Sequence, residues 1–316
     1  MKTKIIAVAG PTASGKTDLA VEIARLVDGE VISNDSMQIY RGMEIGTAAP
    51  TMEERRGIPH HMVGVCDPNE EFSCADYSER AREIIDDINS RGKVPVFCGG
   101  TGLYLDSVLT LSDLSESEKD TAVRDRLTRY AESHGNEALH DRLRSVDPDA
   151  AEAIHMNNVR RVVRALEIYE TTGITKTEWD RRSKERELPY DVSMAIIEFA
   201  DRDLLYSRID RRVHLMMEAG LLCEVKNLFE NGLLSRGKPA FQAIGYKEFI
   251  PYLEGVASLE ECIAEVQTAS RRYAKRQLTW FRRYDNAVRL LRDCDGEVRS
   301  IEALAREFLE KSGFVR

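Results

Sequence analysis

The chain has 316 residues, of which 42% are hydrophobic, and its formal net charge at pH 7 is −9. This length is enough for about two domains with a large apolar core. No stretch reaches the ~20 uncharged apolar residues of a membrane span, so we expect a cytoplasmic protein with no membrane partner. The negative charge disfavours a nucleic-acid partner, but salt screens surface charges beyond about 8 Å, so a local cluster of cations matters more than the total.

A glycine-rich loop follows the apolar run at residues 5–9 and precedes a helical pattern. The loop reads Gly10-Pro11-Thr12-Ala13-Ser14-Gly15-Lys16-Thr17. A strand that enters Gly-x-x-x-x-Gly-Lys-Thr and continues as a helix turns several backbone N–H groups toward one point, where the helix N-terminus adds partial positive charge. Such a P-loop binds a diphosphate, with Lys16 as a point charge and the Thr17 hydroxyl placed for Mg²⁺. The loop alone does not reveal whether the bound phosphate is transferred or leaves.

Two further strands are predicted at residues 30–33 and 94–98. The first ends at Asp35, and the second runs into the glycine-rich turn at residues 99–102. Because the carboxyl ends of parallel strands line the ligand crevice of an α/β sheet, we expect Asp35 to lie beside the P-loop. P-loop proteins that hydrolyse ATP usually carry an acid that holds Mg²⁺ at such a strand end, whereas this turn has none. Asp35 is therefore the acid that we expect in the crevice. It could act in the chemistry there, or it could be a metal ligand or a helix cap.

A change of composition near Leu114 begins a region with helical patterns and no strand pattern until about Asp191. The fold that we predict is a P-loop NTPase-like parallel sheet flanked by helices, with an inserted all-helical domain. Residues 1–114 and 190–316 would form the α/β core, and residues 115–189 the insertion.

Within the insertion, a helix is predicted over Val159–Thr172, with Gly173 as its C-terminal cap. Arg160, Arg161 and Arg164 fall within an arc of about 100° on this helix. Taken alone, such a face is better explained as solvated surface than as a contact with a polyanion.

The core resumes with a predicted strand at residues 192–197 and then a helix in which Arg208 and Arg212 are neighbours at i, i+4. These arginines either pair with Asp201 or Asp210 or reach the anion in the crevice. The spacing leaves both possibilities open.

The most basic stretch lies between residues 271 and 283 and contains no acid. Its cations are Arg271, Arg272, Lys275, Arg276, Arg282 and Arg283. On a helical projection they span about 140°, while the aromatic residues between 273 and 284 occupy a separate arc. A helix of this kind packs its aromatic side on the protein and offers its cationic side to phosphates, as expected for a nucleic-acid backbone contact.

Seven motifs in this order are characteristic as a set. They are the P-loop at 10–17, Asp-Ser-Met-Gln-Ile-Tyr at 35–40, Gly-Thr-Ala-Ala-Pro at 46–50, Pro-His-His at 59–61, Gly-Gly-Thr-Gly-Leu-Tyr at 99–104, Ala-Ile-Gly-Tyr at 243–246 and Ala-Lys-Arg-Gln-Leu-Thr-Trp-Phe-Arg at 274–282. With them the chain resembles the bacterial tRNA dimethylallyltransferases, also called tRNA isopentenyltransferases. The resemblance covers most of the chain.

The resemblance implies transfer of a dimethylallyl group from dimethylallyl diphosphate to N6 of the adenine 3′-adjacent to the anticodon in tRNA, with release of pyrophosphate. Mg²⁺ is the implied cofactor, and Arg212 would join the P-loop around the diphosphate. Asp35 would be the general base that takes a proton from the adenine amine, with Thr12 and Thr101 at the reacting centre.

By the same resemblance, the inserted domain would hold the anticodon stem-loop, and the protein would act as a monomer. The residues implied to contact tRNA are Asp35, Ser36, Met37, Gln38, Thr101, Arg124, Arg160, Arg161, Arg164, Gln242, Gly245, Tyr246, Lys247, Lys275, Arg276, Gln277, Trp280 and Arg282.

Three other functions remain open at this point. A small-molecule P-loop kinase would bind ATP in the loop and hold the acceptor hydroxyl with Asp35. A nucleotide-gated RNA-binding module would need the basic helix but neither Asp35 nor the turn at 99–102. An enzyme that prenylates free adenine nucleotides would have no use for cationic helices.

Overall fold

The computed structural model describes residues 2–109, 121–185, 189–294 and 296–314. The chain divides into two compact units, of which the first comprises residues 1–108 and 190–316 and the second residues 109–189. The boundary predicted after residue 114 lies outside the described residues.

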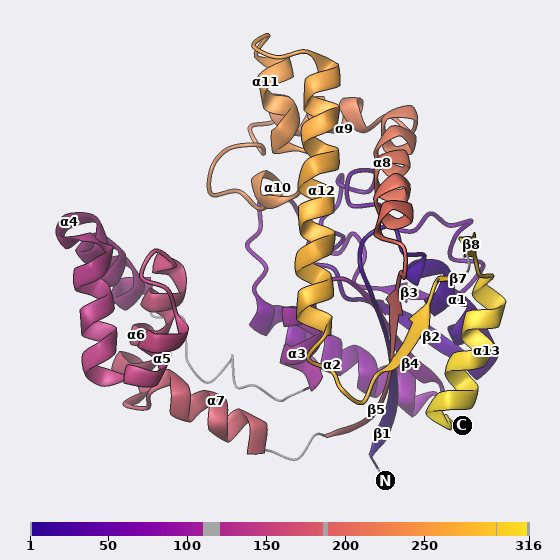
Figure 1. The fold of residues 1–316 in the computed structure, drawn as a ribbon, viewed down its shortest axis with the longest axis horizontal. Coiled ribbons are helices and arrows are strands. Elements are labelled where there is room, and N and C mark those ends of the chain that lie inside the picture. Colours follow the sequence, from indigo (N-terminus) through magenta and orange to yellow (C-terminus); the bar gives the residue numbers. More distant parts are fainter. Residues whose placement is uncertain (1, 110–120, 186–188, 295, 315–316) are drawn as a thin grey trace. The chain divides into compact units, whose positions relative to one another are not determined.

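Six strands form a parallel sheet in the first unit (Figure 1), in the order β3-β2-β4-β1-β5-β6. Their bounds are β1 Thr3–Ala9, β2 Gly29–Ser33, β3 His60–His61, β4 Val94–Gly99, β5 Tyr190–Glu198 and β6 Val288–Leu291. The predicted P-loop NTPase-like sheet flanked by helices is confirmed. The inner strands β1 and β4 are almost continuously buried, as expected where helices cover both faces of a parallel sheet.

Helices α1 (Lys16–Val27) and α13 (Ile301–Ser312) pack together against one face of the sheet (Figure 1). Leu19 and Ile23 of α1 and Phe308 of α13 are fully buried there. Burial of each such side chain contributes roughly 1.5–3 kcal/mol of hydrophobic free energy, and this contact fixes the helix whose N-terminus completes the P-loop.

Helix α2 (Cys74–Ser90) packs against β2 and β4. It begins at a capping box in which Ser73 Oγ accepts a hydrogen bond from Asp76 N and the Asp76 carboxylate accepts one from Ser73 N. The cap satisfies N–H groups that the first helical turn leaves without partners. Tyr77, one turn on, donates its hydroxyl to Ser33 O at 3.0 Å and so ties α2 to the end of β2.

The rest of the first unit is mainly helical. Its elements are α3 (Gly102–Leu109), α8 (Arg202–Glu218), α9 (Leu221–Glu230), α10 (Pro239–Gln242), η1 (Lys247–Phe249), α11 (Ile250–Leu253), α12 (Leu259–Phe281) and the small ribbon of β7 (Asp293–Cys294) and β8 (Glu297–Val298). A second apolar core, which includes Val213, Phe249 and Val266, joins α8 to α12. The long helix α12 runs alongside α8 (Figure 1).

Helix α12 ends at Phe281, so Arg282, Arg283 and Tyr284 lie beyond it. The helical projection drawn from the sequence through residue 284 is therefore wrong for its last three residues.

The second unit contains α4 (Thr121–Val146), α5 (Pro148–Ala153), α6 (Val159–Thr172) and α7 (Lys176–Glu185), and its described residues form no strand. The predicted helix over 159–172 is confirmed, and Gly173 caps it with φ 71°. Leu127, Leu143 and Leu166 belong to the apolar core of this unit. In neither unit do the described residues form a helix long and apolar enough to cross a membrane.

Candidate active site

The P-loop connects β1 to α1 with alternating backbone conformations. Ala13 has φ 61° and Gly15 has φ 86°, both in the left-handed region, which is costly for a residue with a side chain such as Ala13. This alternation forms a nest of N–H groups for an anion. Ser14 Oγ is buried with no hydrogen-bond partner among the described residues, and Lys16 Nζ donates to Pro11 O at 3.3 Å. The loop thus holds polar groups that a bound anion would satisfy.

A cavity of about 270 Å³ lies in front of the loop and is lined by Thr12, Lys16 and Thr17 among others. Four of its described lining side chains are cationic, and one is acidic. The cations are Lys16, Arg212, Lys247 and Arg276, and the acid is Asp35. Burial lowers the pKa of Lys16, and the positive charge of Arg212 lowers it further, while Cys98 and Asp35 oppose the shift. The cavity has an excess of positive charge suited to a polyphosphate.

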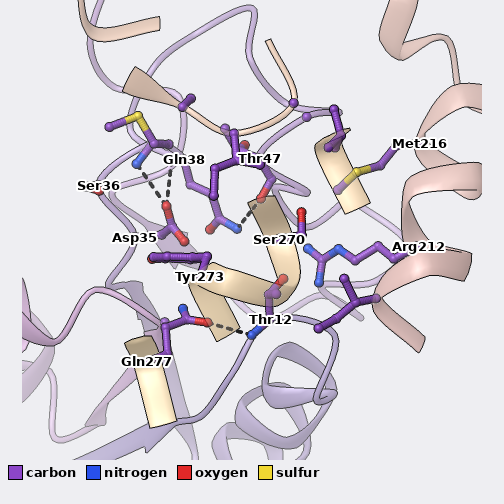
Figure 2. A pocket seen from close by; sticks show the side chains of 18 of the residues that line it. Thr12, Asp35, Ser36, Gln38, Thr47, Arg212, Met216, Ser270, Tyr273 and Gln277 are labelled. Carbon is purple, nitrogen blue, oxygen red and sulfur yellow. Dashed lines mark hydrogen bonds between the residues drawn. The ribbon is translucent and has the colours of Figure 1, made fainter. Parts of the chain in front are cut away.

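Asp35 lies at the end of β2 and lines this cavity, as predicted. Its Oδ1 accepts hydrogen bonds from Met37 N at 2.9 Å and Gln38 N at 3.4 Å (Figure 2). Ser36 N donates to Thr101 Oγ1 at 3.1 Å, so Thr101 supports the same turn. One carboxylate oxygen of Asp35 thus caps a turn, whereas the alternative considered from the sequence was a helix cap, and no helix begins at this position. No described residue donates a hydrogen bond to Oδ2, which remains able to accept a proton.

Arg208 and Arg212 both point to the P-loop region from α8. Arg208 Nε donates to Ala13 O at 3.0 Å, and Arg212 reaches into the cavity near Thr12 (Figure 2). The alternative pairing with acids of their own helix is wrong, because Asp201 caps α8 and Asp210 pairs with an arginine of α12.

Gln277 joins the P-loop to the turn after β4. Its Oε1 accepts a hydrogen bond from Thr12 N at 2.8 Å, and its Nε2 donates to Gly100 O at 3.1 Å. A Cβ on Gly100 would lie 1.9 Å from Gln277 Nε2, and one on Gly102 would lie 2.0 Å from Trp280 Nε1. Because Gly100 and Gly102 have no side chain, Gln277 and Trp280 of α12 can pack directly against the backbone of this turn. Gln277 is buried, lines the cavity and makes two hydrogen bonds within the protein, so its tRNA contact stays a prediction while its role in joining the loop to the turn is observed.

Two pocket residues on α12 were missed as site residues. Ser270 and Tyr273 line the cavity, and Tyr273 lies next to Asp35 (Figure 2), although the sequence assigned its ring to the packing side of the helix. Burial raises the pKa of the Tyr273 hydroxyl, so it stays protonated. The available signal was spacing, because Ser270, Tyr273 and Gln277 follow one another at three and four residues on one helical face.

The other residues predicted to contact tRNA from the first unit differ in exposure. Gln242, Lys275, Arg276 and Arg282 are exposed, whereas Lys247 and Trp280 are half-buried and Gly245 is buried. Tyr246 is 0% exposed, and its hydroxyl is 2.9 Å from Met43 O and 2.8 Å from Glu224 Oε1. Tyr246 is a core residue, so its predicted RNA contact is wrong.

The basic stretch at 271–283 is less free than its sequence indicated. Arg271 pairs with Asp210, and Arg283 pairs with Asp106 and stacks on Trp280 at 4.0 Å. Acids from other elements therefore neutralise two of its six cations.

In the second unit, Glu167 is fully buried and pairs with two of the arginines predicted to contact tRNA. Arg124 Nη2 lies 2.8 Å from Glu167 Oε2, and Arg164 Nη1 lies 3.1 Å from the same oxygen. Removal of one partner from a buried ion pair is strongly destabilising, so these two arginines have a structural role. Arg160 and Arg161 are exposed.

Two family models match the chain, IPP transferase over residues 38–284 and Isopentenyl transferase over residues 3–62. The chain belongs to the IPP transferase family. The family predicted from the sequence motifs is confirmed, and its members are transferases. The tRNA dimethylallyltransferase of Bacillus cytotoxicus is 50% identical over 89% of this chain and 88% of its own length. That of Halalkalibacterium halodurans is 49% identical over 91% of both chains.

Solved structures of the family agree with the fold. The tRNA isopentenylpyrophosphate transferase of Bacillus halodurans has a TM-score of 0.70 and 44% identity, covering 99% of this chain and 98% of that one. A eukaryotic dimethylallyltransferase described as acting on tRNA has a TM-score of 0.76 and 35% identity, covering 88% of this chain and 70% of that one.

The donor set in the cavity fits a magnesium ion that is shared with a diphosphate. No described group of three or more His, Cys, Asp or Glu side chains forms a metal centre of its own. Mg²⁺ prefers oxygen ligands, keeps several waters and commonly uses one or two side chains together with substrate phosphates. Thr17, with its hydroxyl at the start of α1, lines the cavity beside the loop and meets this requirement.

Proposed function

We propose that the protein transfers the dimethylallyl group of dimethylallyl diphosphate to N6 of the adenine 3′-adjacent to the anticodon in tRNA, releasing pyrophosphate. The observation that carries this proposal is the cavity, where the described lining side chains include the P-loop, four cations and a single acid, Asp35. Departure of a diphosphate calls for concentrated positive charge, and attack by a weakly nucleophilic amine calls for one base. Relatives that share about half of the sequence carry the name tRNA dimethylallyltransferase.

The leaving group would be bound by the P-loop, residues 10–17, with Lys16 and Arg212. Negative charge grows on the diphosphate as the bond from C1 of the dimethylallyl group to oxygen breaks. N–H groups and cations that already point at this position stabilise the transition state without reorganisation. Thr17 would hold Mg²⁺, which adds positive charge at the leaving group when it is bound.

The nucleophile would be activated by Asp35. N6 of adenine forms the bond to C1, the electron pair of the C1–O bond leaves with the diphosphate, and the N6 proton passes to the carboxylate. Backbone N–H groups of Met37 and Gln38 fix Oδ1, so Oδ2 is the oxygen left for the proton. Thr12 lines the cavity and would line the reacting centre, whereas Thr101 does not line the cavity and would act from beside it, through its hydrogen bond from Ser36 N.

The RNA would be held by exposed cations while the adenine leaves its stack, which costs a few kcal/mol. Arg160 and Arg161 of the inserted helical domain, together with Lys275, Arg276 and Arg282, are exposed and suited to phosphate contacts. Gln242 and Lys247 line or border the cavity and suit the flipped nucleotide. We propose that one copy of the chain suffices for this activity.

The test uses purified protein, Mg²⁺ and dimethylallyl diphosphate labelled in its carbon chain. An anticodon stem-loop RNA with adenine directly after the anticodon should acquire the label, whereas the same RNA with guanine at that position should not. Label transfer to free adenosine monophosphate instead would support the nucleotide-prenylating alternative. Phosphate transfer from γ-labelled ATP to a small molecule, without prenyl transfer, would establish the kinase reading. RNA binding without either transfer would leave only a binding module.

A further inference from the structure

Arg292 is a buried cation that forms no ion pair with any acid in the described part of the chain. It follows β6 at the carboxyl edge of the sheet and is 8% exposed. Its Nε and Nη1 are buried and have no hydrogen-bond partner, and no acid among the described residues lies within ion-pairing distance of it. By contrast Arg289, three residues earlier, pairs with Glu198, and Arg299 pairs with Glu307. The lack of a partner is thus a property of this position and not of the region.

The guanidinium of Arg292 packs against the P-loop. A Cβ on Gly15 would lie 3.5 Å from Arg292 Nε and 3.9 Å from its Nη2. Arg208 touches the same loop from α8 through its bond to Ala13 O at 3.0 Å. Neither arginine lines the cavity, so both contact the loop from outside, one at Ala13 and one at Gly15.

The buried charge of Arg292 lowers the stability of the folded protein when no ligand is bound. An ion removed from water without a partner is costly, and an uncharged side chain of similar volume is often as stable or more stable. Burial lowers the pKa of Arg292, and the like charge of Arg208 lowers it further, against the opposing acids Asp18 and Glu302. A residue that served packing alone would not need this charge.

We propose that Arg292 is a positioning residue that maintains positive potential behind the P-loop and receives its compensating charge from the diphosphate bound in front. The inference rests on the proposed function, because it takes the ligand of the loop to be a diphosphate. It predicts two effects of opposite sign: loss of the charge should raise the stability of the ligand-free protein and should weaken diphosphate binding. A residue with only a structural role would show no such opposition.

The test compares the full chain with Arg292→Met, using titration calorimetry with pyrophosphate in Mg²⁺ and thermal unfolding. The variant should bind pyrophosphate about tenfold more weakly, as expected for one charge separated from the ligand by the loop. Its Tm without ligand should rise by about 2 °C. Arg292→Lys keeps the charge and should keep the affinity within about threefold of the original.

Arg289→Met is the matched control, because it removes an arginine that pairs with Glu198 and does not line the cavity. It should lower Tm and leave pyrophosphate affinity unchanged. Equal pyrophosphate affinity in the original chain and Arg292→Met, or equal losses in Arg292→Met and Arg289→Met, would overturn the inference. Failure of the original chain itself to bind pyrophosphate would overturn the proposed function, a result distinct from failure of one variant.

Discussion

Buried charges at the two ends of the sheet differ in whether they have ion-pair partners. At the carboxyl end, Lys16, Arg212 and Arg292 gather around the P-loop, and no described acid forms an ion pair with any of them. Near the amino end of β2, a single acid, Glu30, is 2% exposed and is surrounded by three cationic or titratable side chains. They are Arg91, Lys93 at 2.9 Å and His61 at 2.9 Å.

We infer that the charges at the P-loop end serve ligand binding, whereas those around Glu30 stabilise the fold. Around Glu30 the ion pairs are complete, and they connect β2 to the ends of β3 and α2 without any ligand. Around the P-loop these cations form no ion pair within the described residues, so a bound anion would supply the compensating charge. The same comparison predicts that substitutions at the two ends change different measurements.

The largest expected effect is at Lys16. Lys16→Met removes the P-loop cation that the proposed function places on the diphosphate, so kcat/KM for prenyl transfer should fall by about 10³-fold. Thermal stability should be unchanged or higher, because the lost charge had no acid partner. Kinetics and thermal melting on one preparation measure both quantities. Activity within tenfold of the original chain would contradict the proposed role of Lys16 in stabilising the leaving diphosphate.

Asp35→Asn tests the only acid among the described residues that line the cavity. Asparagine keeps the oxygen that accepts from Met37 N and Gln38 N but cannot take the amine proton. We expect kcat to fall by about 10²-fold with RNA affinity within about threefold. Asp67→Asn is the control, since Asp67 Oδ1 accepts from Asn69 N at 3.0 Å in a similar turn outside the cavity. Near-normal turnover of Asp35→Asn would remove its role as base.

A third test asks whether exposed cations of the second unit also bind an anion, here the phosphates of RNA. The double substitution of Arg160 and Arg161 by Gln should weaken stem-loop RNA binding about tenfold and reduce the slope of log Kd against log salt by about two. Arg126→Gln removes an exposed arginine that pairs with Glu170, and it should change neither value. An unchanged salt slope in the double variant would mean that these arginines are plain solvated surface.

Glu30→Gln should give the smallest change in activity and a clear change in stability. The hydrogen bonds of Arg91, and then of Lys93 and His61, lower the pKa of Glu30 below its ordinary 4.5. The folded protein therefore gains stability from this carboxylate above pH 4.5 and loses it as the pH falls. The variant should melt about 5 °C lower near neutral pH and show less loss of Tm between about pH 5 and pH 3. Equal acid sensitivity in both proteins would contradict the assignment.

Local patterns in the sequence were sufficient for several features. The P-loop, the strand before Asp35 and the helix over 159–172 each depend on residues adjacent in the chain, where turn, cap and periodicity signals are direct. The position of Asp35 beside the loop followed from one rule about the carboxyl ends of parallel strands.

Features that depend on partners far along the chain were not predictable. Gln277 bonds to Thr12, 265 residues away, and its amide was therefore assigned to RNA instead of to the loop. Arg124 meets Glu167 across two helices, and Arg271 meets Asp210 across two others. In each case the residue type was identified correctly as polar or cationic, but its partner depends on tertiary packing that periodicity does not encode.

The most direct test of the account is the stoichiometry of the released phosphate. With donor labelled in both the carbon chain and the diphosphate, each modified stem-loop RNA should appear together with one intact pyrophosphate, and Lys16→Met should lower both signals in the same proportion. Release of orthophosphate, or modified RNA formed without pyrophosphate, would contradict the claim that the unpaired cations of the P-loop end serve a departing diphosphate.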